Sequence, residues 1–503
     1  MWVVPSIERV GLSDPAGSST FANLSAARGE YESFQIVVRA PENHRLTNVN
    51  VAATDLRGSP DRIIAKANVA LFREHYVQVT KSSPDWGGTN RPLGAGEYAD
   101  ALISFVDPET GAPATGGRLQ AAPFNVAAGT NQPIWVDVFV PRTAVAGEYR
   151  GSFAVTSDQG SASVGVALRV WNFTLPLTPS LKSAFAAAQA TGPAVARTLL
   201  RNKVSPLAVA PDHARDLIEN FGLRSANLGL WSGADVSHCT MSPAPAANQI
   251  RAAARHYPAD LRLYDFLADE IGACPNLYPD VRGWAGALHE AGVKSLITMA
   301  PVPELFNDGT GRSAVDIWVV LPKMYDQAAD HIARARTKGD EVWSYNTLVQ
   351  DAYSPKWEID FAPINFRIQP GFISQSLNLT GLLYWRIDMW PSDAWNNVNN
   401  AGTFSSNNYP GDGMLVYPGD EAGIHGVAPS MRLKWIRDGV EDYEYVALLK
   451  KAGYGDWAMQ VARSVGADWT RWTRDPNALE SARQELGQKL DQLGGNTSPP
   501  PAQ

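Results

Sequence analysis

Two adjacent carboxylates, Asp269 and Glu270, end a predicted β-strand and are the residues best suited to chemistry in this sequence. They follow an apolar run and precede a loop that contains Gly, Pro and Asn. A protonated carboxylic acid can donate to a leaving oxygen while an ionised one attacks or stabilises positive charge, as glycosidic bond cleavage requires. The alternative is a strand-end aspartate that caps the next loop beside a solvated glutamate.

Apolar strands alternate with amphipathic helical stretches from about residue 178, a pattern typical of parallel βα units. Eight such units predict a (β/α)8 TIM barrel over residues 178–450, with its active site at the strand ends and the loops that follow. Because neighbouring strand residues point to opposite faces, joint use of Asp269 and Glu270 requires a local bulge or an early loop. The predicted strands cover residues 182–188, 204–210, 225–231, 261–270, 294–300, 315–321, 341–346 and 381–387.

Short alternating segments separated by Gly, Pro and Asn turns fill residues 1–177, and they predict an N-terminal antiparallel β-sandwich. We expect this domain to support the barrel, because the segment at residues 72–88 reads as a loop long enough to reach it. After the barrel, residues 451–494 predict a helical extension. Residues 495–503 have the composition of a disordered tail.

Aromatic and amide side chains at two other strand ends are candidates for substrate binding, because aromatic faces stack on the apolar faces of sugar rings. Two of them, Trp343 and Trp385, are equally compatible with core packing beneath the pocket. The predicted substrate-binding residues are Trp343, Tyr345 and Asn346 after the seventh strand and Trp385, Asp388 and Trp390 after the eighth.

The two cysteines, Cys239 and Cys274, follow neighbouring strands on the same face of the predicted barrel. A disulfide there, which would favour an oxidising compartment, and a pair of free thiols are both compatible with the sequence.

The histidines form no ligand pair at helical spacing, and the spacing of Asp412 and Asp420 matches no calcium loop. We therefore predict no metal site and no cofactor.

Net charge and hydropathy limit the classes of molecule that the chain is expected to bind. The chain has 503 residues and a formal net charge of -8, without a run of Lys or Arg, so we do not expect nucleic acid as a partner. No stretch approaches the roughly 20 consecutive apolar residues of a membrane span. Residues 1–5 carry no export signal. We expect a secreted or periplasmic protein whose signal peptide is absent from this sequence, with a cytoplasmic protein as the alternative. Oligomeric state is not predicted.

Three C-terminal motifs resemble the closing signature of glycoside hydrolase family 123 and its DUF4091 relatives. These motifs are "GLLYWRIDMW", "GDGMLVYPG" and "MRLKWIRDGVEDYEYVALL". The N-terminal segments "ARGEYESFQIVV" and "VDVFVPRTAVAGEYRGSFAV" resemble the sandwich domain of the same proteins, so the resemblance covers nearly the whole chain.

This resemblance implies exo-acting, retaining release of β-linked N-acetylgalactosamine from an oligosaccharide or glycoconjugate. Asp269 would orient the 2-acetamido group and stabilise its charge, while Glu270 would protonate the leaving oxygen and then activate water. One departure from the family pattern is Ile271, which stands where Pro usually follows the acidic pair. Other sugar specificities, and a non-catalytic carbohydrate-binding protein on the same fold, are the alternatives.

Overall fold

The N-terminal part of the chain forms two β-sheets packed face to face. The structure is a computed structural model that describes residues 1–495, so residues 496–503 of the predicted tail lie outside it. The first sheet has the strand order β1 (Trp2–Pro5), β3 (Tyr31–Arg39), β10 (Asn131–Phe139), β7 (Val69–Val79) and β8 (Gly96–Ser104). The second has the order β2 (Phe21–Arg28), β12 (Gly160–Thr174), β11 (Gly147–Ser157), β4 (Leu46–Ala53) and β9 (Phe124–Val126). In addition, β5 (Leu56–Gly58) pairs with β11, and β6 (Arg62–Ile64) pairs with β5.

Alternating burial explains why these segments form a sandwich. On β4, Val49 and Val51 are buried while Asn48 and Asn50 are exposed, so one face of the strand enters the core. Across the core, the rings of Phe34 on one sheet and Phe153 on the other lie 5.4 Å apart. The predicted N-terminal sheets are confirmed as antiparallel with one exception, since β2 runs parallel to β12.

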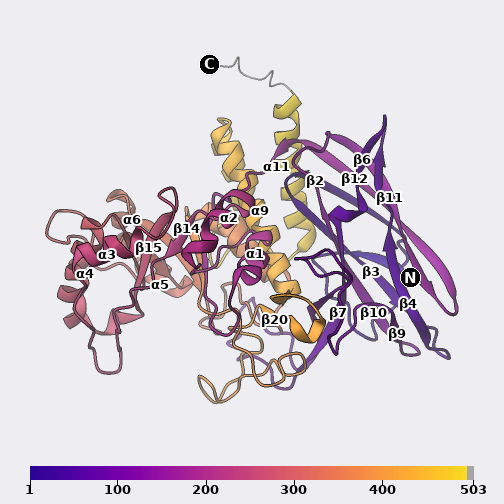
Figure 1. The fold of residues 1–503 in the computed structure, drawn as a ribbon, viewed down its shortest axis with the longest axis horizontal. Coiled ribbons are helices and arrows are strands. Elements are labelled where there is room, and N and C mark those ends of the chain that lie inside the picture. The colour runs from indigo at the N-terminus through magenta and orange to yellow at the C-terminus, as the bar shows by residue number, and fades with distance from the viewer. Residues whose placement is uncertain (496–503) are drawn as a thin grey trace.

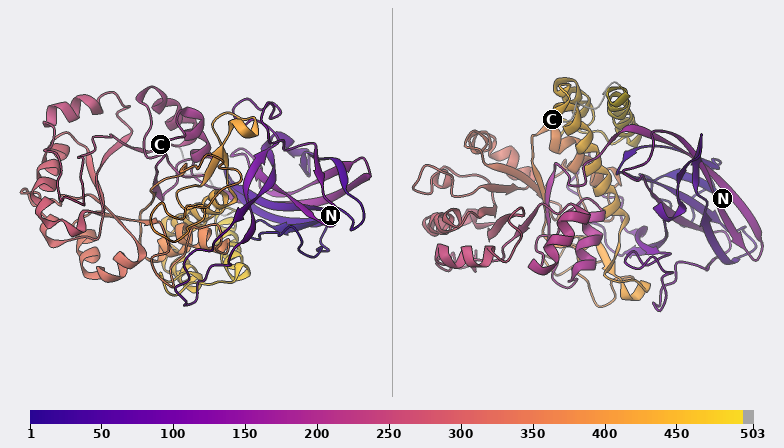
Figure 2. Two further views of the ribbon diagram at one scale, coloured as in Figure 1. Left: turned by 90° about the horizontal axis from the view of Figure 1, so that it is seen from below. Right: turned by 45° about the horizontal axis from the view of Figure 1, so that its top comes forward.

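Seven parallel strands between residues 182 and 384 form a nearly closed barrel. Helices lie outside the strands, as the left view of Figure 2 shows. All seven coincide with predicted strands. Their order is β13 (Lys182–Phe185), β19 (Gly381–Tyr384), β18 (Glu341–Asn346), β17 (Ile317–Val320), β16 (Lys294–Thr298), β15 (Arg262–Asp269) and β14 (Ser225–Asn227).

The predicted strand at residues 204–210 is reduced to a single bridge, between Phe185 and Pro206. Pro206 has no N–H to donate, which limits a regular ladder here. Backbone hydrogen bonds still span the gap, because the Leu207 N–H donates to the Phe185 carbonyl at 2.8 Å and the Asn227 N–H donates to the Leu207 carbonyl at 2.8 Å. The short segment therefore connects β13 to β14.

Helices complete the barrel less regularly than an ideal (β/α)8 fold. Between β16 and β17 the described chain has only a 3-10 turn, Pro303–Leu305. A π-helical turn, Gln369–Ile373, joins α7 to α8. The barrel helices are α1 (Pro193–Arg201), α2 (Pro211–Phe221), α3 (Ala247–Ala254), α4 (Tyr278–Glu290), α5 (Pro322–Gln327), α6 (Ala329–Thr337), α7 (Ile364–Ile368) and α8 (Ser374–Ser376).

Three C-terminal helices, α9 (Met431–Lys451), α10 (Gly455–Val465) and α11 (Pro476–Gly495), lie between barrel and sandwich in Figure 1. Before α9, a small hairpin pairs β20 (Val416–Pro418) with β21 (Val427–Pro429). Two fully buried arginines of α9 reach into the sandwich. Arg432 forms a bidentate pair with Asp100 at 2.8 and 2.9 Å, and Arg437 contacts Asp137 at 2.9 Å. Since buried charges need partners, these pairs fix how the two domains pack.

The prediction of a loop over residues 72–88 is wrong in its first part, because residues 72–79 belong to β7; the segment that follows β7 does reach the barrel. Asp360 accepts hydrogen bonds from the hydroxyls of Ser82 and Ser83, at 2.9 and 2.6 Å. Asn90 donates to Asn365 at 2.7 Å. These contacts fit a supporting role for the sandwich.

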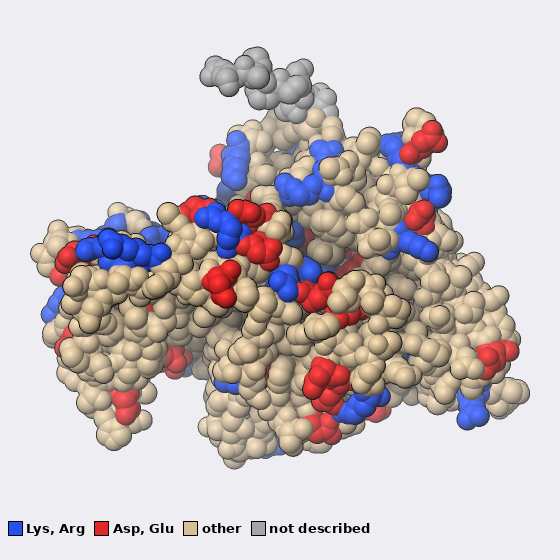
Figure 3. Space-filling view, in the orientation of Figure 1, with Lys and Arg blue, Asp and Glu red and all other residues tan. Residues whose placement is uncertain are grey.

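Acidic and basic side chains lie interspersed on the face shown in Figure 3, with wide uncharged areas between them. Among the helices of the described chain, none combines the length and apolar character that a bilayer crossing requires.

Candidate active site

The two predicted catalytic carboxylates lie at the end of β15, where the strand becomes irregular. The pairing of β15 with β16 shifts register between Phe266 and Ala268, so Leu267 is an extra residue. Asp269 is the last residue of the strand, and Glu270 follows with a left-handed φ of 50°. In a regular strand the two side chains would point to opposite faces. The bulge and the sharp turn provide the irregularity that lets both carboxylates lie in one site.

Thr298, at the end of β16, fixes both members of the pair. Its hydroxyl donates to Asp269 Oδ1. The Glu270 N–H donates to the Thr298 carbonyl at 3.0 Å and lies 3.1 Å from Thr298 Oγ1. The Asp269 side chain is exposed to the pocket, yet the surrounding protein desolvates it enough to raise its pKa, while the Thr298 hydroxyl acts in the opposite direction. Both acids are thus anchored to the neighbouring strand.

Tyr345, on β18, holds the second carboxylate from across the barrel. Its hydroxyl donates to Glu270 Oε1. Burial and the charge of Glu270 raise the pKa of Tyr345, so the phenol stays protonated and remains a donor at physiological pH. Within residues 1–495, the side-chain hydrogen bonds of the pair engage Oδ1 of Asp269 and Oε1 of Glu270, while Oδ2 and Oε2 accept none.

The pair opens into a pocket of about 410 Å³. Aromatic side chains form much of its wall, among them Phe266, Tyr384, Trp385 and Phe404. The rings of Trp385 and Phe404 meet edge to face at 5.5 Å, and Phe404 is an exposed residue of the long loop between β19 and β20. A pocket with apolar walls and two carboxylates at its base is typical of a site for an amphipathic small molecule such as a sugar.

Of the six predicted substrate-binding residues, Tyr345 and Trp385 line this pocket. Trp343 is buried in the barrel interior, where its Nε1 donates to Glu341 at 3.1 Å. Asn346 is buried, and its amide donates to the Pro355 carbonyl at 2.9 Å and to Gln369 Oε1 at 2.8 Å. Neither Trp343 nor Asn346 is part of the pocket wall.

Asp388 and Trp390 also lie outside the pocket wall. Asp388 is fully buried, and its carboxylate accepts backbone N–H groups of the segment after β13, including that of Ala190 at 2.5 Å. It also accepts from the Arg386 guanidinium at 2.5 Å. Trp390 is half-buried and donates to the Val416 carbonyl at 2.7 Å. Both hold the loops around the barrel mouth.

Asp412, which sequence reasoning considered only as a calcium ligand, lies beneath the pocket wall. It is 3% exposed and lies within hydrogen-bonding distance of three wall residues, Thr347 Oγ1 at 3.2 Å, Tyr384 Oη at 3.3 Å and Trp385 Nε1 at 3.4 Å. Burial raises the pKa of Asp412 to about 6. Sequence analysis did not identify Thr298, although it lies two residues before the end of a predicted strand, whereas Asp412 and Phe404 carry no positional signal because they lie in a long loop.

Cys239 and Cys274 form a disulfide with an S–S distance of 2.04 Å, which resolves the two possibilities left by the sequence. Cys274 is fully buried and follows Glu270 by only four residues. Ile271, at the position where the family usually has Pro, is fully buried in the same apolar cluster as Cys274. The disulfide and this cluster anchor the loop that begins at Glu270.

Within residues 1–495, no group of three or more His, Cys, Asp or Glu side chains is placed to hold a metal ion. The paired carboxylates have the chemistry that acid–base and electrostatic catalysis uses.

Family models match both halves of the chain. The model for the glycoside hydrolase 123 N-terminal domain matches residues 13–157, and that for the glycoside hydrolase 123 catalytic domain matches residues 286–449. The second match begins after Asp269 and Glu270, so it does not itself include the pair. No curated protein matches the chain.

Among solved structures, the chain is similar to a family 123 glycoside hydrolase from Clostridium perfringens. The two share 12% sequence identity with a TM-score of 0.65, over 98% of each chain, which shows a common fold. A β-glucuronidase from Parabacteroides merdae is 10% identical over 79% of this chain and 52% of its own, with a TM-score of 0.27 too low to carry an argument. From the two domain matches and the shared fold, we conclude that this chain belongs to glycoside hydrolase family 123 and is a glycosidase.

Proposed function

We propose that the protein removes terminal β-linked N-acetylgalactosamine, or a closely related 2-acetamido sugar, from glycans with retention of configuration. Support comes chiefly from one observation: two adjacent carboxylates, one held by a hydroxyl from the neighbouring strand and the other by a hydroxyl from across the barrel, line an aromatic pocket. Adjacent residues rarely reach the roughly 5 Å separation across the bond that acid and direct nucleophile require. Attack by the substrate's own acetamido group removes that requirement.

In the first step, the acetamido carbonyl oxygen attacks the anomeric carbon while the bond to the leaving oxygen breaks. Glu270 transfers its proton to the leaving oxygen through Oε2, since Tyr345 occupies Oε1. Asp269 accepts the acetamido N–H through Oδ2 and stabilises the positive charge that develops on the oxazoline-like ring. In the second step, Glu270 takes a proton from water, which attacks the anomeric carbon and restores the acetamido group.

The pocket volume supports exo action. At about 410 Å³ it lies near the lower end of the range for ligand pockets, which suits a terminal sugar better than an internal segment of a long chain. Trp385, held from below by Asp412, is suited to stack on a sugar face. The Clostridium perfringens relative is described in connection with glycolipid glycan hydrolysis, and we propose a glycolipid or other glycoconjugate as the substrate class here.

We also propose that the protein works in a secreted or periplasmic setting. The Cys239–Cys274 disulfide supports this assignment, because disulfides persist mainly in oxidising compartments.

The test compares hydrolysis of aryl β-glycosides that differ only at carbon 2. Substrate assistance predicts turnover of the N-acetylgalactosaminide, with the matching galactoside inert or far slower. Equal turnover of the two would overturn the mechanism and leave a glycosidase of another type. Product anomers followed by proton NMR at early times should show the β form first, and an initial α product would contradict retention.

A further inference from the structure

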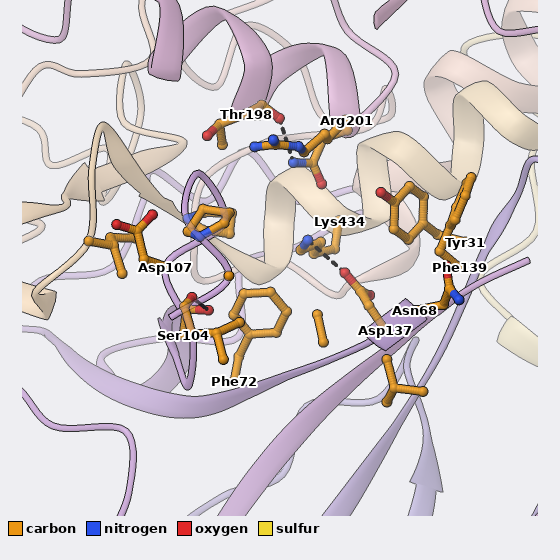
Figure 4. Close-up of a pocket in the computed structure, with 18 of the residues that line it drawn as sticks. Tyr31, Asn68, Phe72, Ser104, Asp107, Asp137, Phe139, Thr198, Arg201 and Lys434 are labelled. Atoms are coloured by element: carbon orange, nitrogen blue, oxygen red, sulfur yellow. Dashed lines mark hydrogen bonds and ion pairs between the residues drawn. The ribbon is translucent and has the colours of Figure 1, made fainter. Parts of the chain in front are cut away.

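A second cavity, of about 300 Å³, lies where the sandwich meets the barrel, and it shares no lining residue with the active-site pocket. Its lining residues come from both domains. Tyr31, Phe72 and Asp137 belong to the sandwich strands β3, β7 and β10, whereas Asn202 follows α1 and Lys434 is on α9. Figure 4 shows Tyr31, Phe72 and Asp137 around Lys434, with the ion pair between Lys434 and Asp137 dashed.

Asn202 gives the cavity an unused hydrogen-bond acceptor. The residue is only 3% exposed, and its amide nitrogen donates to the Thr198 carbonyl at 2.8 Å. Its side-chain oxygen is buried and has no hydrogen-bond partner. Since a buried acceptor without a partner is costly, a ligand group that donates a hydrogen bond would stabilise this site.

Lys434, on α9, supplies hydrogen-bond donors to the same cavity. It is 5% exposed, and its ammonium lies 2.7 Å from Asp137 Oδ2 and 4.8 Å from the centre of the Phe72 ring. An ammonium carries three N–H groups, and the Asp137 contact uses one of them. Asp137 is itself saturated, because it also binds Ser33, Trp135 and Arg437.

The charges around the cavity are already paired, while its aromatic surfaces are broad. Lys434 pairs with Asp137, Arg201 pairs with Glu109 at 2.8 Å, and Asp107 contacts the His425 imidazole, so each charged side chain that lines the cavity already has a protein partner. The rings of Tyr31 and Phe139 lie 4.8 Å apart and, with Phe72, give the cavity an apolar side. This combination of apolar faces with one acceptor and one donor suits a neutral ring that carries hydroxyls.

We propose that this cavity is a non-catalytic binding site for a neutral monosaccharide or a polyol of similar size. A ligand hydroxyl donates to Asn202 Oδ1, another accepts from the Lys434 ammonium, and a ring face lies against the aromatic side. Because the contacts come from both domains, the bound sugar bridges sandwich and barrel. The site does not depend on the specificity proposed for the active site.

The experiment measures sugar binding to the full chain carrying Glu270→Gln, which stops turnover, by saturation-transfer NMR and calorimetry. Probes are galactose, N-acetylgalactosamine and glucose, with acetate and inorganic phosphate as ionic probes. Asn202→Leu removes the acceptor with little change in volume, and Ala70→Phe fills the cavity from β7. Asn220→Leu, on the exposed face of α2, is the matched control.

We expect one of the neutral sugars to bind, and Asn202→Leu to weaken binding about tenfold, the effect of one hydrogen bond. Ala70→Phe should abolish binding at this site, and Asn220→Leu should leave it unchanged. In the background with an intact Glu270, neither cavity variant should alter kcat on an aryl glycoside. The proposal is overturned if no neutral sugar binds, if only the ions bind, or if both cavity variants bind sugar like the control while their melting temperatures show that they are folded.

Discussion

Replacing Thr298 with Val isolates the hydrogen bond that holds Asp269. Valine matches threonine in shape, so the change deletes the hydroxyl that donates to Asp269 Oδ1 and leaves the packing of this buried position intact. The Glu270 N–H keeps its partner, because it also donates to the backbone carbonyl of residue 298 at 3.0 Å. The perturbation therefore acts on Asp269 far more than on Glu270.

The expected magnitude follows from the kind of bond lost. Hydrogen bonds to charged groups contribute roughly 1.5–3 kcal/mol, and the exposure of Asp269 to the pocket favours the lower figure through solvent screening. About 1.5 kcal/mol corresponds to roughly a tenfold change in rate. The hydroxyl lowers the pKa of Asp269, so its loss raises that pKa. The proposed mechanism needs Asp269 ionised. As pH falls, the variant should therefore begin to lose activity at a higher pH than wild type does.

The assay is the pH profile of kcat/KM on an aryl N-acetyl-β-galactosaminide for wild type, Thr298→Val and Thr298→Ser. We expect the acidic limb of the Val variant to move to higher pH, with a loss of about tenfold on that limb and a smaller loss above it. The Ser variant, which retains the hydroxyl, should follow wild type. A Val profile that superimposes on wild type, or that falls equally at every pH, would refute the role assigned to Thr298.

Three further predictions concern stability. Arg432→Leu should destabilise the fold by about 3–5 kcal/mol, because it leaves Asp100 buried without its bidentate partner, and a lower denaturant midpoint would show this. Reducing the disulfide should cost about 4 kcal/mol for a loop of 35 residues, and an unchanged melting temperature in reductant would contradict it. The native pKa of Asp412, about 6, lies above the unfolded value of about 4, so this carboxyl makes a contribution to the free energy of unfolding that rises as pH falls from about 6 to about 4. Asp412→Asn should therefore raise the melting temperature more at neutral pH than at about pH 4; a difference between variant and wild type that is the same at both pH values would contradict this.

Strand patterns predicted most of the architecture, because burial follows alternation and apolar runs closely in this chain. The seven barrel strands coincide with predicted ones. The pattern failed at residues 204–210, where the apolar run is interrupted by Pro206 and only a bridge forms. It also missed the parallel pairing of β2 with β12. The alternation of buried and exposed residues predicts a strand, but it does not show in which direction two strands distant in sequence will pair.

Site residues were harder to predict, since a sequence gives the face of a strand but not the height of a residue in the barrel. Trp343 and Tyr345 are two positions apart on β18 and therefore point to the same side. Tyr345 reaches the pocket, whereas Trp343 lies deeper against Glu341. Asn346, the next residue, points to the other side and binds Gln369. Strand stagger, which sequence does not reveal, decides which residue meets the ligand.

The central claim is that Asp269 and Glu270 perform the reaction, and initial rates of aryl N-acetyl-β-galactosaminide hydrolysis test it most directly. The proteins to compare are wild type, Asp269→Asn, Glu270→Gln and Glu219→Gln, the last an exposed carboxylate of α2 far along the chain from the pair. The account predicts losses of about a hundredfold or more in the first two variants and none in the third, with all four equally folded. Wild-type rates in folded Asp269→Asn or Glu270→Gln would contradict the assignment.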